Sequence, residues 1–307
     1  MKPQSCSSLR ALVTSLAGLF LATLFATAQT TSTWTGSANN AWDNPSNWNP
    51  YGVPPVDAVV VINSGSPNAA ALGAFTQHGV NLNGGTLTAN GLSVSELNQS
   101  GGSLAGTNTI GAGGRWSWRS GWLYGVLTIE NGATAEFITA SDKWFADGAE
   151  LHNHGEIIWT GGRLMGYRHY GPATLRNHAG ARFVAAGGTG MANQFGNYEG
   201  RFILEAGAEF LKQSGADITC NWRLQNAGAL AVNAGILRWN AGGASSGLFT
   251  NQAGAALVFS GGTHTLAGGT QLLGDGNFQV AWDTVTASGV VTHGRADSPG
   301  VLELVGG

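Results

Sequence analysis

The chain has 307 residues, a net charge of −3 and only 10% charged residues, against about 25% in an ordinary globular domain. Its few Lys and Arg residues are not clustered, which excludes a nucleic-acid-binding surface, because phosphate binding needs grouped positive charge. The 49 glycines occur beside 11 Trp and 12 Phe, which argues against disorder and indicates many short strands separated by turns.

Residues 1–28 have the layout of a secretory signal peptide. Lys2 and Arg10 precede an apolar run, and the small-residue pattern Ala26-Thr27-Ala28 predicts cleavage after Ala28. The run is shorter than the about 20 residues that span a bilayer as a helix, and no later run is long enough, so we expect no transmembrane segment in the mature chain. That chain would be exported, with Cys220 as its only cysteine.

The segment 29–62 is predicted to cap one end of a repetitive β structure. Its three tryptophans can lie over an apolar core, and its prolines cannot donate hydrogen bonds to a strand, so they would end strand pairing. The run Asp57–Ile62 reads as the first proper strand. The alternative is that these aromatic side chains stack on sugar rings. The residues concerned are Trp34, Trp42, Trp48, Pro45, Pro50, Pro54 and Pro55.

The segment 115–124 is the densest aromatic and basic cluster of the chain. Trp116, Trp118, Trp122 and Tyr124 alternate, which predicts that they share one face of an extended strand. We expect that face to be part of the core, because burial of such large rings is strongly stabilising. If the face points outward instead, the four side chains form a shelf that could bind carbohydrate by stacking.

Residues 63–307 contain a repeat of about 24 residues, clearest between Leu127 and Leu257. Each copy has an apolar residue, an asparagine two positions later and then glycine and a run of strand formers. We expect the asparagines to stack in a structural ladder from coil to coil, with Leu204 in the asparagine position of a degenerate copy. The ladder residues are Asn153, Asn177, Asn226 and Asn251.

This period, together with strand alternation and the absence of helical periodicity after residue 28, predicts an all-β fold, a parallel β-helix (β-solenoid). Stacked coils would bury a central apolar column that a single coil cannot bury.

Three histidines form a candidate metal site. His152 and His154 share a face, and His178 follows His154 by one repeat, so His154 and His178 would stack on adjacent coils. His169 could join them. The alternative is a solvated polar face whose charge changes near pH 6.5.

The chain resembles the Gly- and Asn-rich repeat regions of exported bacterial surface proteins, such as autotransporter-associated β-strand repeat proteins. The likeness rests on TWTGSANNAWDNPSNWN, WTGGRLMG, LRNHAGARF, LQNAGALAV and FSGGTHTLAGG. The resemblance implies a right-handed β-helix at the outer surface of a bacterium, with an adhesin-like role. The end ADSPGVLELVGG is similar to segments that further repeats follow in such proteins, so we expect the repeats to continue beyond Gly307.

Polysaccharide-cleaving enzymes also use the β-helix, but the sequence does not favour catalysis. Glycoside hydrolysis needs two carboxylates about 5 to 9.5 Å apart, and the aspartates are scattered, with no Asp-Asp or Asp-x-Asp pair. Glu136 and Glu209 match in phase but would lie three coils apart. We therefore expect a structural or adhesin-like protein with no cofactor, whose partners are extracellular glycans or host and matrix surfaces. The alternative is a carbohydrate-binding or polysaccharide-cleaving β-helix.

Overall fold

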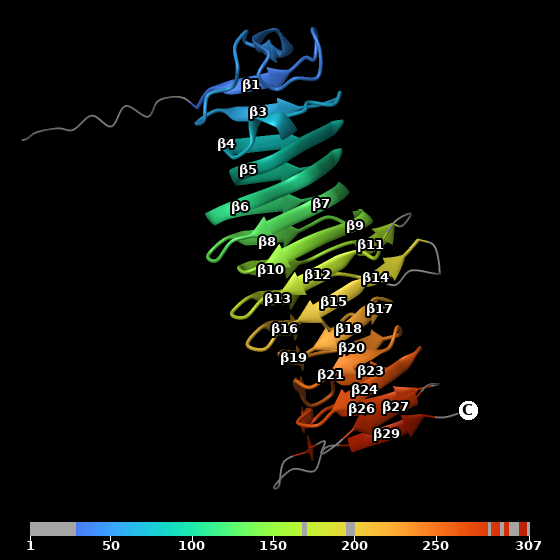
Figure 1. Cartoon of the computed structure of the whole chain (residues 1–307). Helices are drawn as coiled ribbons and strands as arrows, with labels where there is room; N and C mark the ends of the chain where they lie inside the picture. Colours follow the sequence, from blue (N-terminus) through green and yellow to red (C-terminus); the bar gives the residue numbers. More distant parts are fainter. Residues whose placement is uncertain are drawn as a thin grey trace, which may run out of the picture.

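The computed structural model shows an all-β protein built as a parallel β-solenoid of about 10 turns, with 59% of residues in strands. The structure describes residues 29–167, 171–194, 200–281, 284–288, 292–294 and 301–305. The coils form one column, with the N-terminal coils at one end and β29 at the other (Figure 1). The predicted signal peptide, residues 1–28, lies outside the described residues. No helix in the described part of the chain is long and apolar enough to cross a membrane.

Most strands are four or five residues long, but β4 to β7 and β9 are longer because they continue around corners of the coil. Two short 3-10 helices, η1 (Pro45–Asn47) and η2 (Ala70–Leu72), lie in the N-terminal coils. The strands are β1 (Thr31–Trp34), β2 (Trp48–Asn49), β3 (Val59–Ile62), β4 (Phe75–Leu82), β5 (Thr86–Gln99), β6 (Ser103–Trp118), β7 (Gly121–Ile129), β8 (Thr134–Phe137), β9 (Lys143–Asn153), β10 (Glu156–Trp159), β11 (Arg163–Tyr167), β12 (Thr174–Asn177), β13 (Arg182–Ala185), β14 (Gly190–Asn193), β15 (Arg201–Leu204), β16 (Glu209–Lys212), β17 (Ile218–Cys220), β18 (Arg223–Asn226), β19 (Ala229–Val232), β20 (Ile236–Trp239), β21 (Gly243–Ser245), β22 (Leu248–Asn251), β23 (Ala256–Phe259), β24 (Thr263–Ala267), β25 (Gln271–Gly274), β26 (Asn277–Ala281), β27 (Thr284–Ser288), β28 (Thr292–His293) and β29 (Val301–Val305).

The strands form three stacks, which are the three walls of the solenoid. Stack 1 contains β8, β10, β13, β16, β19, β22 and β25. Stack 2 contains β11, β14, β17, β20, β23 and β26, and stack 3 contains β12, β15, β18, β21, β24 and β27. The long strands β5 and β6 contribute to all three stacks, whereas β7 and β9 contribute to stacks 2 and 3. Pairing is parallel in every described strand pair except β1 with β2.

The interior is filled by the alternate side chains of each strand, as the pattern predicted. Trp159, Trp222 and Trp239 have no exposed surface, and Phe183, Phe202 and Phe210 pack on one another with ring centroids 5.4–5.5 Å apart. Cys220 also lies in this column, where burial raises the pKa of its thiol, so the thiol remains protonated. Because one continuous cluster runs from Trp34 to Phe278, the coils share a single core.

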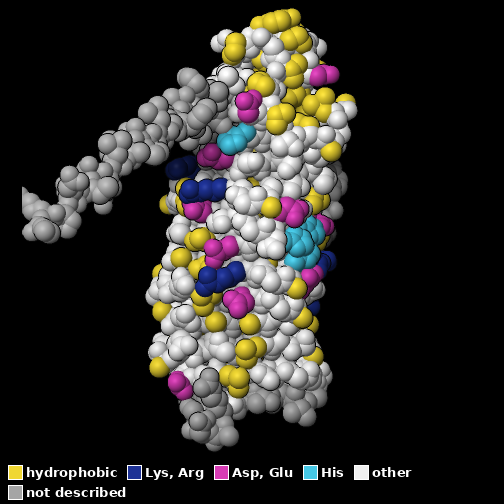
Figure 2. All heavy atoms as spheres, turned by 90° about the vertical axis from the view of Figure 1, so that its left-hand side faces the viewer, with side chains coloured by type: hydrophobic (Ala, Val, Ile, Leu, Met, Phe, Trp, Pro, Cys, Tyr) yellow, Lys and Arg dark blue, Asp and Glu magenta, His cyan; other side chains and the backbone are white. Residues whose placement is uncertain are grey.

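The N-terminal tryptophans form a buried cluster over the first coil. Trp48 packs edge-on against both Trp34 and Trp42, with centroids 5.0 and 4.8 Å apart, and its Nε1 donates to the Trp42 carbonyl oxygen at 2.7 Å. All three rings are at least 94% buried, which makes them core residues. Parallel strand pairing begins earlier in the chain than predicted, because β1 already pairs in parallel with β3. Apolar side chains gather at this end of the column, and Tyr51, Val53 and Val56 are exposed there (Figure 2).

Candidate functional site

Trp116 and Trp118 are core residues and are not available to bind sugar. Both are 0% exposed, and their rings stack on each other with centroids 4.5 Å apart. Trp118 also packs edge-on against Phe137 of the next coil, at 5.2 Å. This confirms the core interpretation for these two residues and contradicts their assignment to a binding shelf.

Trp122 and Tyr124 lie on the outer wall, so the prediction that all four aromatic residues share one face was wrong. Strand β6 ends at Trp118 and β7 begins at Gly121, after a corner formed by Arg119 and Ser120. Gly121 has a φ of +103°, and a Cβ there would lie 2.5 Å from the Gly102 carbonyl oxygen. Counting alternate residues across this corner fails, because the chain changes direction and the inward position passes to Leu123.

Four partly exposed rings form an aromatic shelf on stack 2, namely Trp122, Tyr124, Trp144 and Tyr167. Trp122 and Trp144 are register partners on β7 and β9, and their rings stack with centroids 4.8 Å apart and planes 22° apart. The Tyr124 ring is 5.9 Å from Trp122 and 27° from parallel to it. Tyr167 meets Trp122 edge-on, at 5.3 Å and 89°. The shelf therefore draws its side chains from three successive coils.

Sequence reasoning missed Trp144 and Tyr167. Their link to Trp122 depends on the length of the corner between stacks 1 and 2, which is Arg119–Ser120 in one coil and Ile138–Asp142 in the next. The segment Lys143-Trp-Phe145 held a signal for Trp144. Its tryptophan lies between two inward positions, which indicates that it points outward, one coil before β11.

Carboxylates flank the shelf. Asp142 accepts from the Arg163 guanidinium at 2.6 Å, and this hydrogen bond is the main reason that the pKa of Asp142 lies below its ordinary value. Within β9, Asp147 lies near Tyr124. Burial, followed by the charge of Asp147 and then the neighbouring Tyr167, raises the pKa of the Tyr124 phenol. An acidic side chain, Asp147, thus lies beside the Tyr124 end of the shelf.

The three predicted histidines come together on stack 3 and the adjoining corner. His154 and His178 stack with centroids 3.9 Å apart and planes 5° apart, as the repeat spacing predicted. His152 Nδ1 lies 2.9 Å from His178 Nε2, and histidine side chains gather beside acidic ones on this face (Figure 2).

Both ring nitrogens of His152 and of His178 are engaged in hydrogen bonds. His152 Nε2 lies 2.9 Å from Glu150 Oε2, and His178 Nδ1 lies 3.1 Å from Glu205 Oε2. Glu205 also accepts from Arg176 at 3.0 Å. Burial, then the nearby His154, lowers the pKa of His178, and Glu205 opposes the shift.

This arrangement does not support the metal hypothesis. The nitrogens that would bind a metal point at one another or at carboxylates, and no group of three or more His, Cys, Asp or Glu side chains among the described residues is arranged to hold an ion. His169, the fourth candidate, lies outside the described residues. The cluster is a hydrogen-bonded polar column whose charge responds to pH.

The asparagine ladder is present for part of the predicted set. Asn153 and Asn177 are buried register partners, and Asn153 Nδ2 donates to Asn177 Oδ1 at 2.9 Å. Leu204 then pairs with both Asn177 and Asn226, which confirms it as the degenerate copy. The asparagines also close corners, since Asn153 and Asn226 accept from the N–H groups of Gly155 and Gly228.

Asn251 does not belong to this ladder. Asn226 pairs with Ser245 in stack 3, whereas Asn251 lies on β22 in stack 1 and pairs with Val232 and Gly274. The prediction assumed coils of equal length, but paired residues are 24 positions apart at Leu151 and Leu175 and 19 apart at Leu230 and Phe249. Similar Asn-Gly corners therefore occur on different walls.

Two buried lysines went unnoticed in the sequence. The Lys143 ammonium donates to the carbonyl oxygens of Thr139, Ser141 and Gly161 at 2.7–2.9 Å, and Lys212 donates to those of Ser214 and Ala234. Both side chains are 0% exposed. Burial lowers the pKa of Lys143 to about 8, although Asp142 opposes the shift, and it also lowers the pKa of Lys212. These ammonium groups are donors to corner carbonyls.

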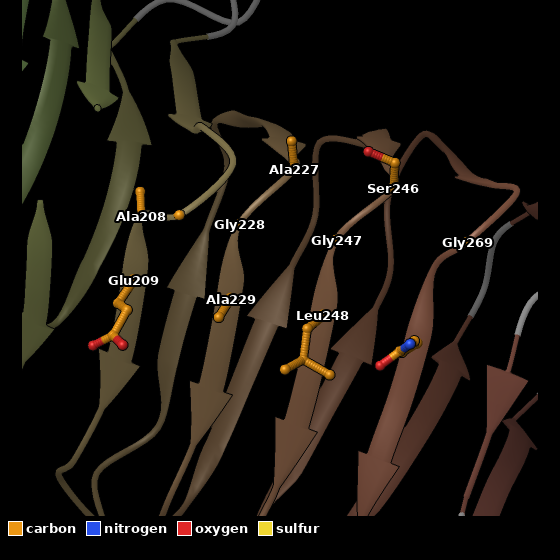
Figure 3. A pocket seen from close by; sticks show the side chains of 11 residues that line it. Ala208, Glu209, Ala227, Gly228, Ala229, Ser246, Gly247, Leu248 and Gly269 are labelled. Atoms are coloured by element: carbon orange, nitrogen blue, oxygen red, sulfur yellow. The ribbon is translucent and has the colours of Figure 1, made fainter. Parts of the chain in front are cut away.

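A shallow groove of about 390 Å³ follows one corner of the later coils, between stacks 3 and 1 (Figure 3). Small residues and glycine backbone line most of it, and Glu209 is its one charged residue. Arg182 Nε lies 3.7 Å from this carboxylate. Of Gly228, Gly247 and Gly269, only Gly269 has open space where a Cβ would lie, whereas a Cβ at either of the other two would meet the backbone of the preceding coil. The groove brings together no chemically reactive group.

Glu136 and Glu209 lie in the same stack, three strands apart as predicted. The prediction that they match in phase was wrong, because Glu209 is in register with Thr134 and not with Glu136. Each forms an ion pair with an arginine. They therefore do not form a close carboxylate pair.

Comparisons with protein-family models, with curated proteins and with solved structures find no match for this chain. The resemblance to exported bacterial repeat proteins stays a prediction.

Proposed function

We propose that this chain is an exported, non-catalytic, adhesin-like β-solenoid that makes contacts with other surfaces at the outside of a bacterial cell. The observation that carries the proposal is the in-register stacking of outward side chains on successive coils. Such stacking turns a flexible chain into a rigid wall that holds outward side chains in fixed columns over several coils. The signal-peptide pattern of residues 1–28 supports export.

Outward columns of different chemistry lie on different walls. Stack 1 presents Glu156, Arg182 and Glu209 in register, joined by ion pairs of 3.0 and 3.7 Å. The corner after stack 3 presents His154, His178 and Glu205, and stack 2 presents the aromatic shelf. A protein that works by display needs several rigid, chemically distinct surfaces of this kind.

Two measurements test the proposal on the full chain produced in a bacterial host. Mass spectrometry of the exported product should find Gln29 at its N-terminus, and beads coated with that product should adhere saturably to bacterial cells or extracellular matrix, with soluble protein competing. An intracellular product that still contains residues 1–28 contradicts export, and coated beads that adhere no more than albumin-coated beads contradict adhesion.

A further inference from the structure

The aromatic shelf has one covered side and one uncovered side. Trp144 stacks on the face of Trp122 that points toward the later coils, and Tyr167 packs edge-on against Trp122 from two coils further along. These contacts hold the Trp122 ring in place. A ring fixed in this way loses little conformational entropy when a ligand binds to it.

The side toward the earlier coils carries only small residues. Ser103 and Ala105 of β6 are the register partners of Trp122 and Tyr124, and Thr86 and Thr88 of β5 lie one coil further away. None of these side chains is large enough to cover an indole or phenol ring. Ser103, Thr86 and Thr88 also supply hydroxyl groups that can donate and accept hydrogen bonds. The result is a pair of nearly parallel rings above a floor of hydroxyl groups.

This combination is suited to a pyranose chain. One face of many pyranoses is lined by C–H groups that pack on an aromatic ring, while the hydroxyl groups at the rim need polar partners. The Trp122 and Tyr124 centroids are 5.9 Å apart, a separation comparable to that of neighbouring units along a polysaccharide. Four partly covered side chains are too few for a protein interface, which buries about 800 Å² on each partner.

The charged groups beside the shelf favour one class of polysaccharide over another. Asp147 lies on the Tyr124 side, and Asp142, which forms an ion pair with Arg163, lies in the corner two residues before Trp144. A polyuronate would bring a carboxylate toward Asp147, which costs free energy. A neutral polysaccharide meets no such repulsion.

We propose that the aromatic shelf binds neutral polysaccharide, with consecutive pyranose units stacked on Trp122 and Tyr124 and hydroxyl groups bound by the floor residues of β5 and β6. The inference names a ligand class for the contact function proposed above and rests on it only for access to extracellular polysaccharide.

Affinity gel electrophoresis of the purified full chain tests the site. The gels contain xyloglucan, mixed-linkage β-glucan or galactomannan as neutral probes, with polygalacturonate and chitosan as charged ones. We expect at least one neutral polysaccharide to retard the wild-type protein and polygalacturonate not to do so. Trp122→Ala should weaken binding about tenfold, because the loss of a stacked ring costs about 1.4 kcal/mol.

A blocking variant protects the test against misfolding. Ser103→Phe keeps Trp122 but places a ring on its uncovered side, so it should abolish retardation without lowering the melting temperature. Tyr51→Ala is the matched control, since Tyr51 is a 76% exposed aromatic residue in the N-terminal coil, away from the shelf, and its loss should leave binding unchanged.

Each outcome has a definite meaning. Retardation that survives both Trp122→Ala and Ser103→Phe, or retardation by polygalacturonate alone, overturns the assignment to this shelf. No retardation by any neutral probe also overturns it. If coated beads still adhere in that case, another wall of the solenoid makes the adhesive contacts. A matrix protein that binds the wild type and loses binding with Ser103→Phe would assign the shelf to a protein partner instead.

Discussion

The interior and the outer wall of this solenoid use the same residue types for different purposes. Trp118 and Trp122 are four positions apart, but the first is enclosed and packs on Phe137, while the second stands on the wall beside Trp144. The difference comes from the corner at Arg119 and Ser120, which ends one strand and begins another. Alternation therefore identifies inward and outward residues only within a strand.

The largest expected effect separates these two tryptophans directly. Trp118→Ala should lower the free energy of unfolding by about 3–5 kcal/mol, because it leaves a cavity in a core that relaxes only partly. Trp122→Ala should cost about 1 kcal/mol or less, since its ring is partly exposed. Denaturant unfolding of both variants measures the two values, and equal losses would mean that the shelf is part of the core.

Lys143 tests whether a charged side chain in the interior lowers the free energy of unfolding. Its pKa is about 8 in the folded protein and near 10.4 in the unfolded chain, so between these pH values the unfolded chain binds more protons. The contribution of Lys143 to the free energy of unfolding should therefore rise from pH 8 to pH 10.5, by on the order of 2 kcal/mol. This rise is smaller than the pKa difference alone would give, because the three carbonyl contacts favour the ammonium.

Thermal melts of wild type and Lys143→Met across this pH range measure the contribution. Lys212 adds to this rise and the Cys220 thiol opposes it, because the thiol stays protonated in the folded protein and ionises in the unfolded chain. The difference between the wild-type and Lys143→Met curves therefore isolates the contribution of Lys143. A difference between the two curves that does not grow from pH 8 to pH 10.5 would contradict the depressed pKa.

The asparagines sharpen the comparison within the interior. Asn177→Leu removes the acceptor of Asn153 Nδ2 and should cost about 1–3 kcal/mol. Asn251→Leu should cost less, because Asn251 Oδ1 is buried and accepts no hydrogen bond from the described residues, so only the Asn277 carbonyl oxygen loses a donor. Chemical denaturation should rank the two variants in this order, and the reverse ranking would refute the assigned ladder.

The smallest effect belongs to the outer wall. The pKa of His178 is lower in the folded protein than in the unfolded chain, so stability is complete above about pH 6.5 and falls as the pH drops below it. Glu150, Glu205, Arg176, His152 and His154 all face this ring or its hydrogen-bond partner. We expect a loss of about 1 kcal/mol or less between pH 7 and pH 5. His178→Gln should reduce it, and an unchanged pH dependence in that variant would assign the titration to other groups.

The fold could be predicted because strand alternation and the repeat both follow from burial of one side of every strand. The partnership of Asn153 with Asn177, and of Leu204 with both neighbours, could be predicted where coils follow the repeat closely. Asn251 and Trp144 could not be placed, because each depends on the lengths of corners, which hydrophobic pattern does not record. The buried ammonium of Lys143 could not be foreseen either, since its partners are backbone carbonyls with no sequence signature.

The parallel strand pairing also fixes how far the molecule extends for each added coil. Each coil adds one strand spacing of about 4.8 Å, so about 10 turns give a height of about 50 Å. Chain added within a corner widens the column without lengthening it, whereas one further coil moves everything beyond it by one fixed step. The vertical distance between the buried tryptophans of the first coil and the shelf at Trp122 is therefore a whole number of strand spacings. Inserting or deleting one coil between them would change the height of the shelf by a single spacing and leave its internal geometry intact.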